Sequence, residues 1–280
     1  MGVQASDHFS GARAAADLDA MVAAAQTASR YIATHAGDLA ALTWTAKATA
    51  DFVSEVDLGA EAIIREQLGA RFPDADVLGE ELSPGAGTGA GTTFIVDPLD
   101  GTTNFLHGYP EYSVSIAALV DDDLRAGVVL TAATGEIFTA GSGGGAYRNG
   151  HPIRVSSISE PSRSLIGTGF PFKNLELLEG YLTQLSAVTR QTAGVRRAGS
   201  AALDLCDVAC GRFEAFWELV LAPWDYAAGM LIINEAGGVV TDLCGRPPGF
   251  ASGTAIVAGS PVMHRWLLEV LATATETTLP

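Results

Sequence analysis

Two carboxylates stand three residues apart at the end of an apolar segment. The run Phe94-Ile-Val leads directly into Asp97-Pro98-Leu99-Asp100. An acid that closes a buried strand needs a partner, because burying an unpaired charge is costly. The segment Gly101-Thr-Thr-Asn that follows offers backbone N–H groups and hydroxyls, which suit a phosphate group. Acids that can hold divalent cations, next to amides that can hold an anion, indicate metal-assisted phosphoryl chemistry.

Three further acids lie where a predicted element begins or ends, beside a glycine or a proline: Asp57, Glu80 and Asp225. Each also has a plain structural explanation. Asp57 falls in the first turn of a predicted helix, where the helix dipole favours an acid. Glu80 could belong to a solvated turn, and Asp225 could cap the helix that it opens. The pair of acids at 97 and 100 is harder to explain by structure alone.

Together these groups could form a magnesium site. Mg²⁺ prefers oxygen ligands, usually a few carboxylates with waters and the phosphate oxygens of a substrate. Two such ions that share one bridging acid can clamp the attacking and the leaving oxygens of an in-line displacement. The groups that would suffice are Glu80, Asp97, Asp100 and Asp225, with the backbone carbonyl of Leu99 added.

Composition limits the class of protein. The chain has 280 residues, 48% of them hydrophobic, so it can bury the core of one large domain or of two lobes. No apolar run reaches the roughly 18–20 residues that a membrane span needs, and no signal peptide is recognisable. The net charge of −16 disfavours direct nucleic-acid binding, which needs a basic face. Three cysteines form no disulfide framework, so we expect a cytoplasmic protein.

Hydrophobic periodicity divides the chain into two parts. The first has two predicted helices, a short polar segment at 43–52 and a run of short antiparallel strands, whereas strands alternate with helices in the second. This pattern predicts an α/β (α+β) protein with an N-terminal lobe at 1–155 and a C-terminal lobe at 156–280 that contains a mixed sheet. The predicted helices cover 17–36, 56–70, 175–190, 201–210, 225–236 and 261–273, and the strands 93–97, 112–120, 124–131, 136–140, 165–168, 194–197, 214–218, 238–243 and 254–258.

Three motifs in this order resemble the inositol monophosphatase family of Mg²⁺-dependent, lithium-sensitive phosphatases. They are Gly79-Glu-Glu, Asp97-Pro-Leu-Asp-Gly-Thr-Thr-Asn-Phe and Trp224-Asp-Tyr-Ala-Ala-Gly. The resemblance runs from about residue 20 to 270. The segments 168–173 and 196–205 are similar to the bacterial inositol-1-monophosphatase branch. The family implies a five-layer αβαβα sandwich, shared with fructose-1,6-bisphosphatase, and a homodimer.

The resemblance also implies roles for the acids. Glu80, Asp97 and the Leu99 carbonyl would hold a first Mg²⁺. Asp97 would bridge to a second ion, held also by Asp100 and Asp225, and a third, weaker ion could bind near Glu80. Thr102, paired with Asp57, would orient and help to deprotonate the attacking water, with assistance from Glu80. Most metal ligands would thus lie in the N-terminal lobe and one in the C-terminal lobe.

Substrate contacts follow from the same resemblance. The phosphate would meet the start of a helix at residues 101–103, and the hydroxyls of the alcohol would be read mainly from the C-terminal lobe. Lys47 matches a lysine in the mobile loop of the family. Ser54 departs from the threonine of many relatives, and the loop at 83–92 has no clear counterpart. The implied substrate contacts are Asp100, Gly101, Thr102, Thr103, Gly199, Ser200, Ala201, Glu218 and Asp225.

The function expected from these residues is hydrolysis of a small phosphate monoester. Inositol-1-monophosphatase activity, which releases myo-inositol and phosphate, is the leading interpretation. The metal motif alone does not separate it from fructose-1,6-bisphosphatase, histidinol-phosphatase or 3′-phosphoadenosine phosphatase activity. A different hypothesis is a regulatory partner of the transcription machinery. A non-enzymatic Mg²⁺ or Ca²⁺ binder is disfavoured, because the chain has no D-x-D-x-D-G loop.

Overall fold

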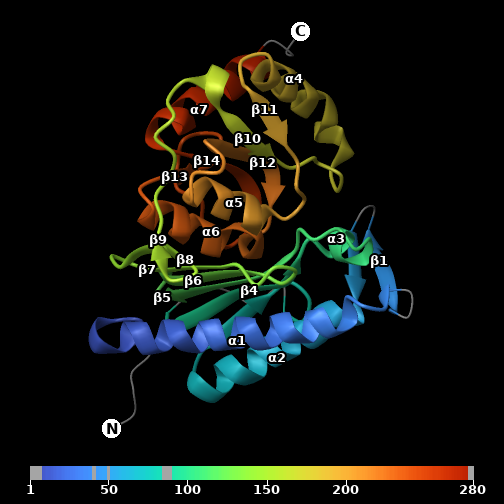
Figure 1. Ribbon diagram of the computed structural model, residues 1–280, viewed down its shortest axis with the longest axis vertical. Coiled ribbons are helices and arrows are strands. Elements are labelled where there is room, and N and C mark those ends of the chain that lie inside the picture. The colour runs from blue at the N-terminus through green and yellow to red at the C-terminus, as the bar shows by residue number, and fades with distance from the viewer. Residues whose placement is uncertain (1–7, 40–41, 49–50, 84–89, 277–280) are drawn as a thin grey trace.

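The chain forms five layers in the order helices, sheet, helices, sheet, helices (Figure 1). The structure is a computed structural model and describes residues 8–39, 42–48, 51–83 and 90–276; most of the loop at 83–92 lies outside these ranges. This architecture confirms the predicted αβαβα sandwich. The outer helices on one side are α1 (Ala14–His35) and α2 (Glu55–Arg71), the central ones α5 (Ala201–Ala209) and α6 (Pro223–Glu235), and those on the other side α4 (Leu178–Thr189) and α7 (Pro261–Glu276).

The first sheet has seven strands in the order β3-β4-β5-β6-β7-β8-β9. Its neighbouring strands are antiparallel, as predicted, except for the parallel pair β3 and β4. The strands are β3 (Asp76–Gly79), β4 (Thr92–Asp100), β5 (Ser113–Val120), β6 (Asp123–Thr131), β7 (Ile137–Gly141), β8 (Gly145–Arg148) and β9 (His151–Pro152).

The second sheet is mixed, as the strand–helix alternation predicted, with the order β11-β10-β12-β14-β13. Two parallel pairings join β10 to β11 and to β12, and the others are antiparallel. Its strands are β10 (Leu165–Thr168), β11 (Gly194–Arg196), β12 (Ala215–Leu221), β13 (Val239–Thr241) and β14 (Thr254–Gly259).

The polar segment at 43–52 has more structure than predicted. It contributes to a two-stranded hairpin of β1 (Trp44–Ala48) and β2 (Asp51–Ser54), which stands apart from both sheets. The Trp44 and Phe52 rings pack edge to face with their centroids 5.3 Å apart. Because Trp44 is half exposed and the strands are short, the hairpin lacks the alternation of buried and exposed residues from which strands are predicted.

The β4 strand explains how acids come to lie between the layers. Phe94 and Val96 belong to the core that α1 and α2 cover, whereas Ile95 faces the core of α5 and α6. Since side chains alternate along a strand, Asp97 points to the α5/α6 side with Ile95. Residues three apart would normally face opposite sides. A register shift between Asp97 and Asp100 allows both carboxylates to face the central helix layer.

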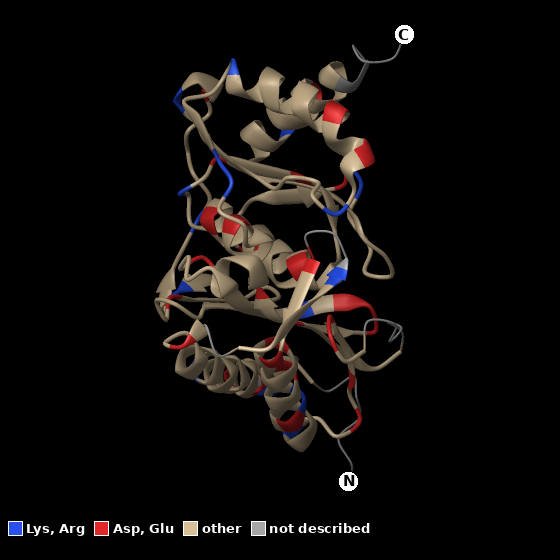
Figure 2. Cartoon of the chain, turned by 90° about the vertical axis from the view of Figure 1, so that its right-hand side faces the viewer, with Lys and Arg blue, Asp and Glu red and all other residues tan. Residues whose placement is uncertain are grey.

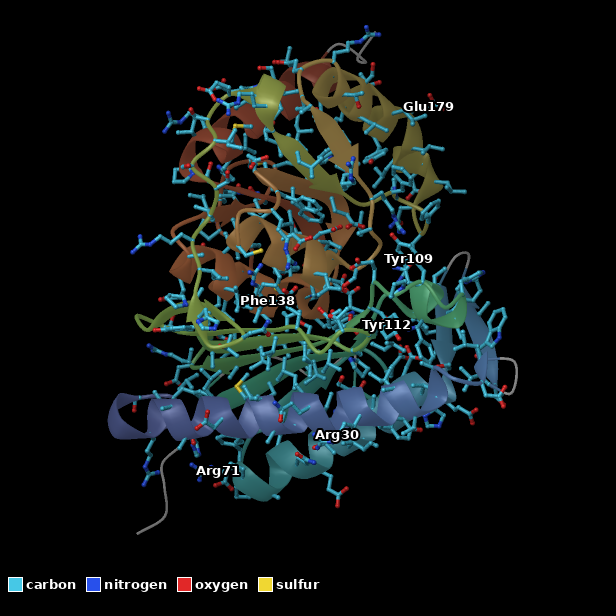
Figure 3. The ribbon with its side chains drawn as sticks, in the orientation of Figure 1. Arg30, Arg71, Tyr109, Tyr112, Phe138 and Glu179 are labelled. Carbon is cyan, nitrogen blue, oxygen red and sulfur yellow. The ribbon has the colours of Figure 1, made fainter. Side chains whose placement is uncertain are left out.

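The central helices pack tightly on the first sheet. Gly127 of β6 lies so close to α6 that a Cβ atom there would sit 3.0 Å from the Ala228 carbonyl oxygen. Phe138, labelled in Figure 3, is buried in the core shared by this sheet and the central helices. That core also contains Phe216 and Ile256 of the second sheet, so the central layer joins both sheets. A boundary near residue 155 falls between β9 and β10, and the division into two lobes stays a prediction.

Charge is spread over the whole molecule. Acidic positions recur in Figure 2 from the helices at the bottom to those at the top. None of the helices in the described ranges combines the length and the apolarity that a membrane crossing requires.

Candidate active site

The Asp57 carboxylate joins the start of α2 to the turn after β4. Ser54 is the N-cap of α2, and its backbone N–H donates to Asp57 Oδ2 at 2.9 Å. The Thr102 hydroxyl donates to the other oxygen, Asp57 Oδ1, at 2.8 Å. Burial raises the pKa of Asp57, and the hydrogen bonds from Ser54 and Thr102 oppose this rise. Asp57 therefore lies in the first turn of α2, as predicted, and is at the same time the hydrogen-bond partner of Thr102.

Three acids meet between the first sheet and the central helices. One oxygen each of Asp97, Asp100 and Asp225 lies within 4.8 Å of the others. Burial and mutual repulsion raise the pKa of Asp97 and of Asp225. Burial raises the pKa of Asp100 to about 6, against the hydrogen bonds that it accepts. Buried carboxylates that repel one another at this spacing fit a divalent cation, which would supply the missing positive charge.

Local structure holds each acid of this group. The Leu99 backbone N–H donates to Asp97 Oδ1 at 3.0 Å. The N-terminus of α5 holds Asp100, whose Oδ2 accepts from the Ser200 hydroxyl at 2.6 Å and from the Ala202 N–H at 2.8 Å. Asp225 caps α6 by accepting the Ala222 N–H at 2.7 Å. Helix N-termini favour negative charge, so they partly offset the repulsion among the three acids.

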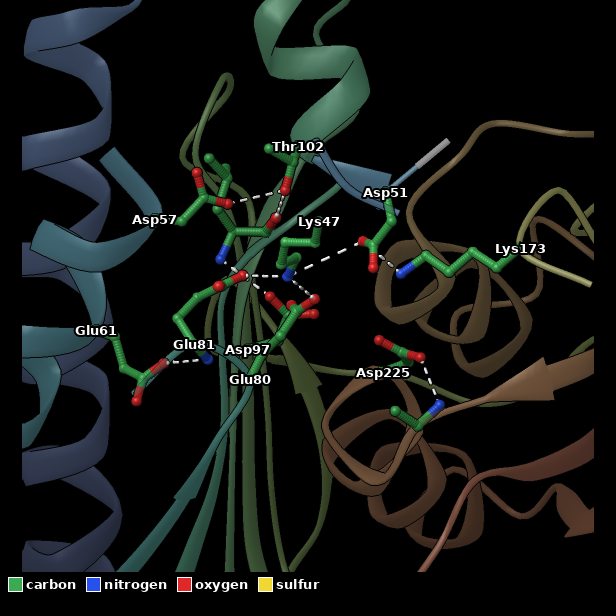
Figure 4. A network of polar contacts seen from close by, with 12 residues as sticks. Lys47, Asp51, Asp57, Glu61, Glu80, Glu81, Asp97, Thr102, Lys173 and Asp225 are labelled. Carbon is green, nitrogen blue, oxygen red and sulfur yellow. Dashed lines mark hydrogen bonds and ion pairs between the residues drawn. The ribbon is translucent and has the colours of Figure 1, made fainter. Parts of the chain in front are cut away.

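Glu80 lies next to this group and is paired with a cation of the chain. Lys47 of β1 places its Nζ 3.1 Å from Glu80 Oε1 and 2.7 Å from Glu81 Oε1 (Figure 4). Burial raises the pKa of Glu81 to about 7 despite this lysine. The Glu80 charge also contributes to the raised pKa values of Asp97 and Asp225. The hairpin thus brings a lysine directly onto a predicted metal ligand.

A cavity of about 600 Å³ opens over these residues. All the predicted site residues line it except Asp57, which lies behind Thr102. A larger hollow of about 800 Å³ lies between α4 and α7 and contains none of them. The predicted residues in the cavity wall are Lys47, Glu80, Asp97, Leu99, Asp100, Gly101, Thr102, Thr103, Gly199, Ser200, Ala201, Glu218 and Asp225. All these residues thus line one cavity, while their chemical roles stay predictions.

The predicted phosphate end of the cavity is formed by the turn between β4 and α3 (Thr102–Leu106). Gly101 is the N-cap of α3 and has a φ of 95°, which favours glycine. A Cβ atom at this position would also lie only 2.8 Å from the Glu111 carbonyl oxygen. A tight glycine turn therefore presents Thr102 and Thr103 to the cavity.

Glu218 of β12 also lines the cavity. Burial raises its pKa to about 8, and the Arg197 charge opposes the rise. A Cβ atom at Gly169 would lie 2.0 Å from the Glu218 carboxyl carbon, so any larger residue there would have to displace this carboxyl group. The raised pKa favours the protonated form of Glu218, in which the carboxyl can donate as well as accept hydrogen bonds.

Sequence reasoning assigned no role to several residues of the wall. Lys173 Nζ lies 2.8 Å from Asp51 Oδ1, which links the hairpin to the loop after β10. The Arg197 guanidinium lies 5.2 Å from the Phe172 ring centroid. Asp204 is buried, and its Oδ1 has no hydrogen-bond partner among the described residues. Lys173, Phe172, Arg197 and Asp204 all lie in the segments whose sequence resembled the bacterial branch, and that resemblance was the only signal for them.

Comparisons with known proteins agree with this geometry. The chain is 44% identical over 254 residues to the inositol-1-monophosphatase of Rhizobium meliloti, covering 91% of this chain and 95% of that protein. It is 42% identical over 258 residues to Nus factor SuhB of Pseudomonas aeruginosa, covering 91% and 95%. The crystal structure of extragenic suppressor protein suhB from Bartonella henselae superposes with a TM-score of 0.86 at 40% identity, covering 91% of this chain and 98% of that chain. The family model described as inositol monophosphatase family matches residues 15–276, the same span that carries all five layers and the acid-lined cavity, and the chain belongs to that family.

Proposed function

We propose that the protein is a Mg²⁺-dependent hydrolase of phosphate monoesters and that its substrate is a myo-inositol monophosphate. The observation that carries the proposal is the convergence of Asp97, Asp100 and Asp225 beside the Thr102–Asp57 pair in one cavity. Membership of a phosphatase family supports the reaction class. The identity of the metal as Mg²⁺ and of the alcohol as inositol goes beyond what family membership supports.

The acids divide into two sets of ligands in this mechanism. Glu80, Asp97 and the Leu99 carbonyl would hold one ion, and Asp97, Asp100 and Asp225 the other, with a third and weaker ion near Glu80. When bound, Mg²⁺ supplies positive charge that attracts the phosphate and makes a water more acidic. Lys47, which pairs with Glu80, would have to release that carboxylate or share it.

Thr102 and Asp57 would hold and move the proton of the attacking water. The Thr102 hydroxyl donates its own proton to Asp57, so its oxygen lone pairs can accept a proton from a water in the cavity. Asp57 has a raised pKa, which makes its carboxylate a better proton acceptor than an ordinary aspartate. The pair would thus orient the water and take up its proton.

The remaining wall residues would position the ester. The turn at Gly101–Thr103 would bind phosphate oxygens through backbone N–H groups and hydroxyls. Glu218 and the Ala201 backbone would meet the hydroxyls of the alcohol, with Gly199 and Ser200 beside them. Because these contacts read only part of the alcohol, related sugar and nucleotide phosphates remain competing substrates.

A substrate panel tests the proposal. Phosphate release is measured with myo-inositol 1-phosphate, fructose 1,6-bisphosphate, histidinol phosphate and 3′-phosphoadenosine 5′-phosphate, each with Mg²⁺ and with a chelator. We expect Mg²⁺-dependent release with the highest kcat/KM for the inositol ester. Release that persists in the chelator would refute the metal mechanism, and a higher kcat/KM for another ester would reassign the substrate.

A second function is favoured by a specific observation: relatives 42% and 41% identical to this chain are named Nus factor SuhB. We propose that the protein also contacts the transcription machinery of its cell, as a cytoplasmic homodimer. Pull-down of RNA polymerase from lysate with wild-type protein and Asp97→Asn tests this. Partner capture that survives loss of the metal site supports a separate role, and absence of polymerase from both pull-downs contradicts it.

A further inference from the structure

The buried carboxylate of Glu61 lies on α2 and plays no part in the proposed chemistry. Its side chain is fully buried. The Glu81 N–H donates to Glu61 Oε2 at 2.8 Å (Figure 4). The Leu82 N–H lies 3.2 Å from each Glu61 oxygen. A carboxylate that accepts two backbone N–H groups holds the turn to which they belong. That turn carries Glu80.

The fit between Glu61 and this turn is tight on its other side as well. A Cβ atom at Gly79 would lie 2.1 Å from Glu61 Oε1, so a larger residue before Glu80 would displace the carboxylate from this position. Gly79 also forms an isolated bridge with Ser83, which closes the turn. The glycine of the Gly-Glu-Glu motif thus lies in direct contact with a side chain of α2.

Arg65, one turn further along α2, contacts the same segment. Its Nη1 lies 3.3 Å from Glu61 Oε1 and 2.5 Å from the Ser83 hydroxyl oxygen. The same nitrogen lies 3.4 Å from the Val77 carbonyl oxygen, at the other end of the segment. Glu61 and Arg65 thus hold residues 77–83 at both ends and in the middle.

The helix that grips this segment also carries Asp57. Asp57 and Glu61 are four residues apart on α2, so they lie on the same face of the helix. Asp57 fixes Thr102, and Glu61 fixes the turn of Glu80. One helix therefore holds both the Asp57–Thr102 pair and the turn of Glu80, a proposed metal ligand.

We propose that Glu61 is a positioning residue that fixes Glu80 for binding of the divalent cation. The proposal rests on the proposed function. Without the carboxylate, the N–H groups of Glu81 and Leu82 lose their acceptor and the turn can rearrange, which weakens binding of the cation. Residues that orient metal ligands typically change metal affinity by about 10–100-fold when they are replaced.

Calorimetric titration of metal-free protein with Mg²⁺ tests this directly. Glu61→Gln keeps the shape of the side chain but replaces one acceptor oxygen by an amide N–H₂, which cannot accept from the backbone N–H groups of Glu81 and Leu82. We expect its dissociation constant for Mg²⁺ to rise at least about tenfold. The Mg²⁺ concentration that gives half-maximal hydrolysis should rise in parallel, while kcat at saturating Mg²⁺ stays within about threefold of wild type.

Asp17→Asn is the matched control. Asp17 is also a fully buried acid on a helix, and it accepts the Phe9 N–H at 3.0 Å and Arg71 Nη2 at 2.6 Å. Arg71 lies at the outer end of α2, away from the cavity (Figure 3). Asp17→Asn should therefore lower the melting temperature as Glu61→Gln does, without changing Mg²⁺ affinity. Equal loss of affinity in both variants would mean general loosening and would overturn the proposal.

A double-mutant cycle assigns the effect to Glu80. In a Glu80→Gln background, adding Glu61→Gln should weaken Mg²⁺ binding little further, because both changes act on one ligand. Should Glu61→Gln fail to fold, Arg65→Gln, on a partly exposed side chain, replaces it with a smaller loss in the same direction expected. Unchanged Mg²⁺ affinity in a folded Glu61 or Arg65 variant overturns the proposal. Failure of wild type to bind Mg²⁺ overturns the proposed function as well.

Discussion

The Thr102 hydroxyl lies 2.8 Å from Asp57 Oδ1 and 3.0 Å from the Leu99 carbonyl oxygen. Its single proton can serve only one of the two acceptors at a time. Binding of a cation to the Leu99 carbonyl, as proposed, would leave Asp57 as the acceptor of this proton. The position of one proton would then couple the proposed metal site to the proposed base.

Removing this hydroxyl should affect turnover and leave metal binding intact. Thr102→Val keeps the branched shape at the start of α3 but can neither orient a water nor pass on its proton. We expect kcat to fall by on the order of 10²–10⁴, the usual share of general acid–base catalysis, with Mg²⁺ affinity unchanged. Steady-state kinetics and calorimetry measure both quantities. Thr183→Val on α4 is the control, and wild-type kcat in Thr102→Val would contradict the assigned role.

Asp97→Asn should abolish activity and stabilise the metal-free protein. The Asp97 carboxylate is fully buried beside three other acids, so its replacement by a neutral amide relieves repulsion. We expect turnover to fall by several orders of magnitude, while the melting temperature in a chelator stays equal or rises. Asp123→Asn, which changes an exposed acid of β6, is the control. A large drop in melting temperature for Asp97→Asn would show that this acid is held for folding instead.

The metal-free protein should lose stability as the pH rises from about 4 to about 8. The folded-state pKa values of Asp100, Glu81 and Glu218 are raised to about 6, 7 and 8, mainly by burial. In the unfolded state these carboxyl groups have ordinary pKa values of about 4. Because their pKa values are higher in the folded state, the folded state binds more protons than the unfolded state between these pH values. The contribution of these groups to the free energy of unfolding is therefore complete below the unfolded-state pKa and is lost as the pH rises through the folded-state pKa. The lowered pKa of His264 has the opposite sign, but it concerns a single group.

Urea unfolding in a chelator at several pH values measures this dependence. Addition of Mg²⁺ should flatten the decline, because bound cations favour the charged carboxylates. A free energy of unfolding that increases with pH across the window, in the chelator, would contradict the assignment of buried protonated acids.

Glu218→Ala should change substrate preference more than it changes the chemistry. The carboxyl lines the cavity from β12 of the second sheet, where the proposal places the alcohol. We expect kcat/KM for myo-inositol 1-phosphate to fall by about 10–100-fold, as for the loss of a hydrogen bond to a buried charged or polar group. Hydrolysis of a simple aryl phosphate should change little. Equal losses on both substrates would mean that Glu218 does not read the alcohol.

The sequence by itself determined the main elements and the acids. The apolar run before Asp97 and the helical spacing in the later segments reflect which parts of each element are buried, and the family resemblance implied the five layers. The Asp97–Asp100 motif, the acid at 225 and the glycine turn at 101 are local patterns, so they could be found without coordinates. The hairpin at β1 and β2 was missed as secondary structure, because exposed, short strands leave no such pattern.

Only the tertiary structure decided which of these residues meet. The register shift that turns Asp97 and Asp100 to one side depends on pairing with β5, and the approach of Asp225 depends on α6 packing on that sheet. Lys47 reaches Glu80, and Glu61 grips the turn at 79–83, across segments far apart in the chain. Such contacts have no periodicity of their own. They arise when layers pack, because packing and buried hydrogen bonding fix side chains that the sequence leaves free.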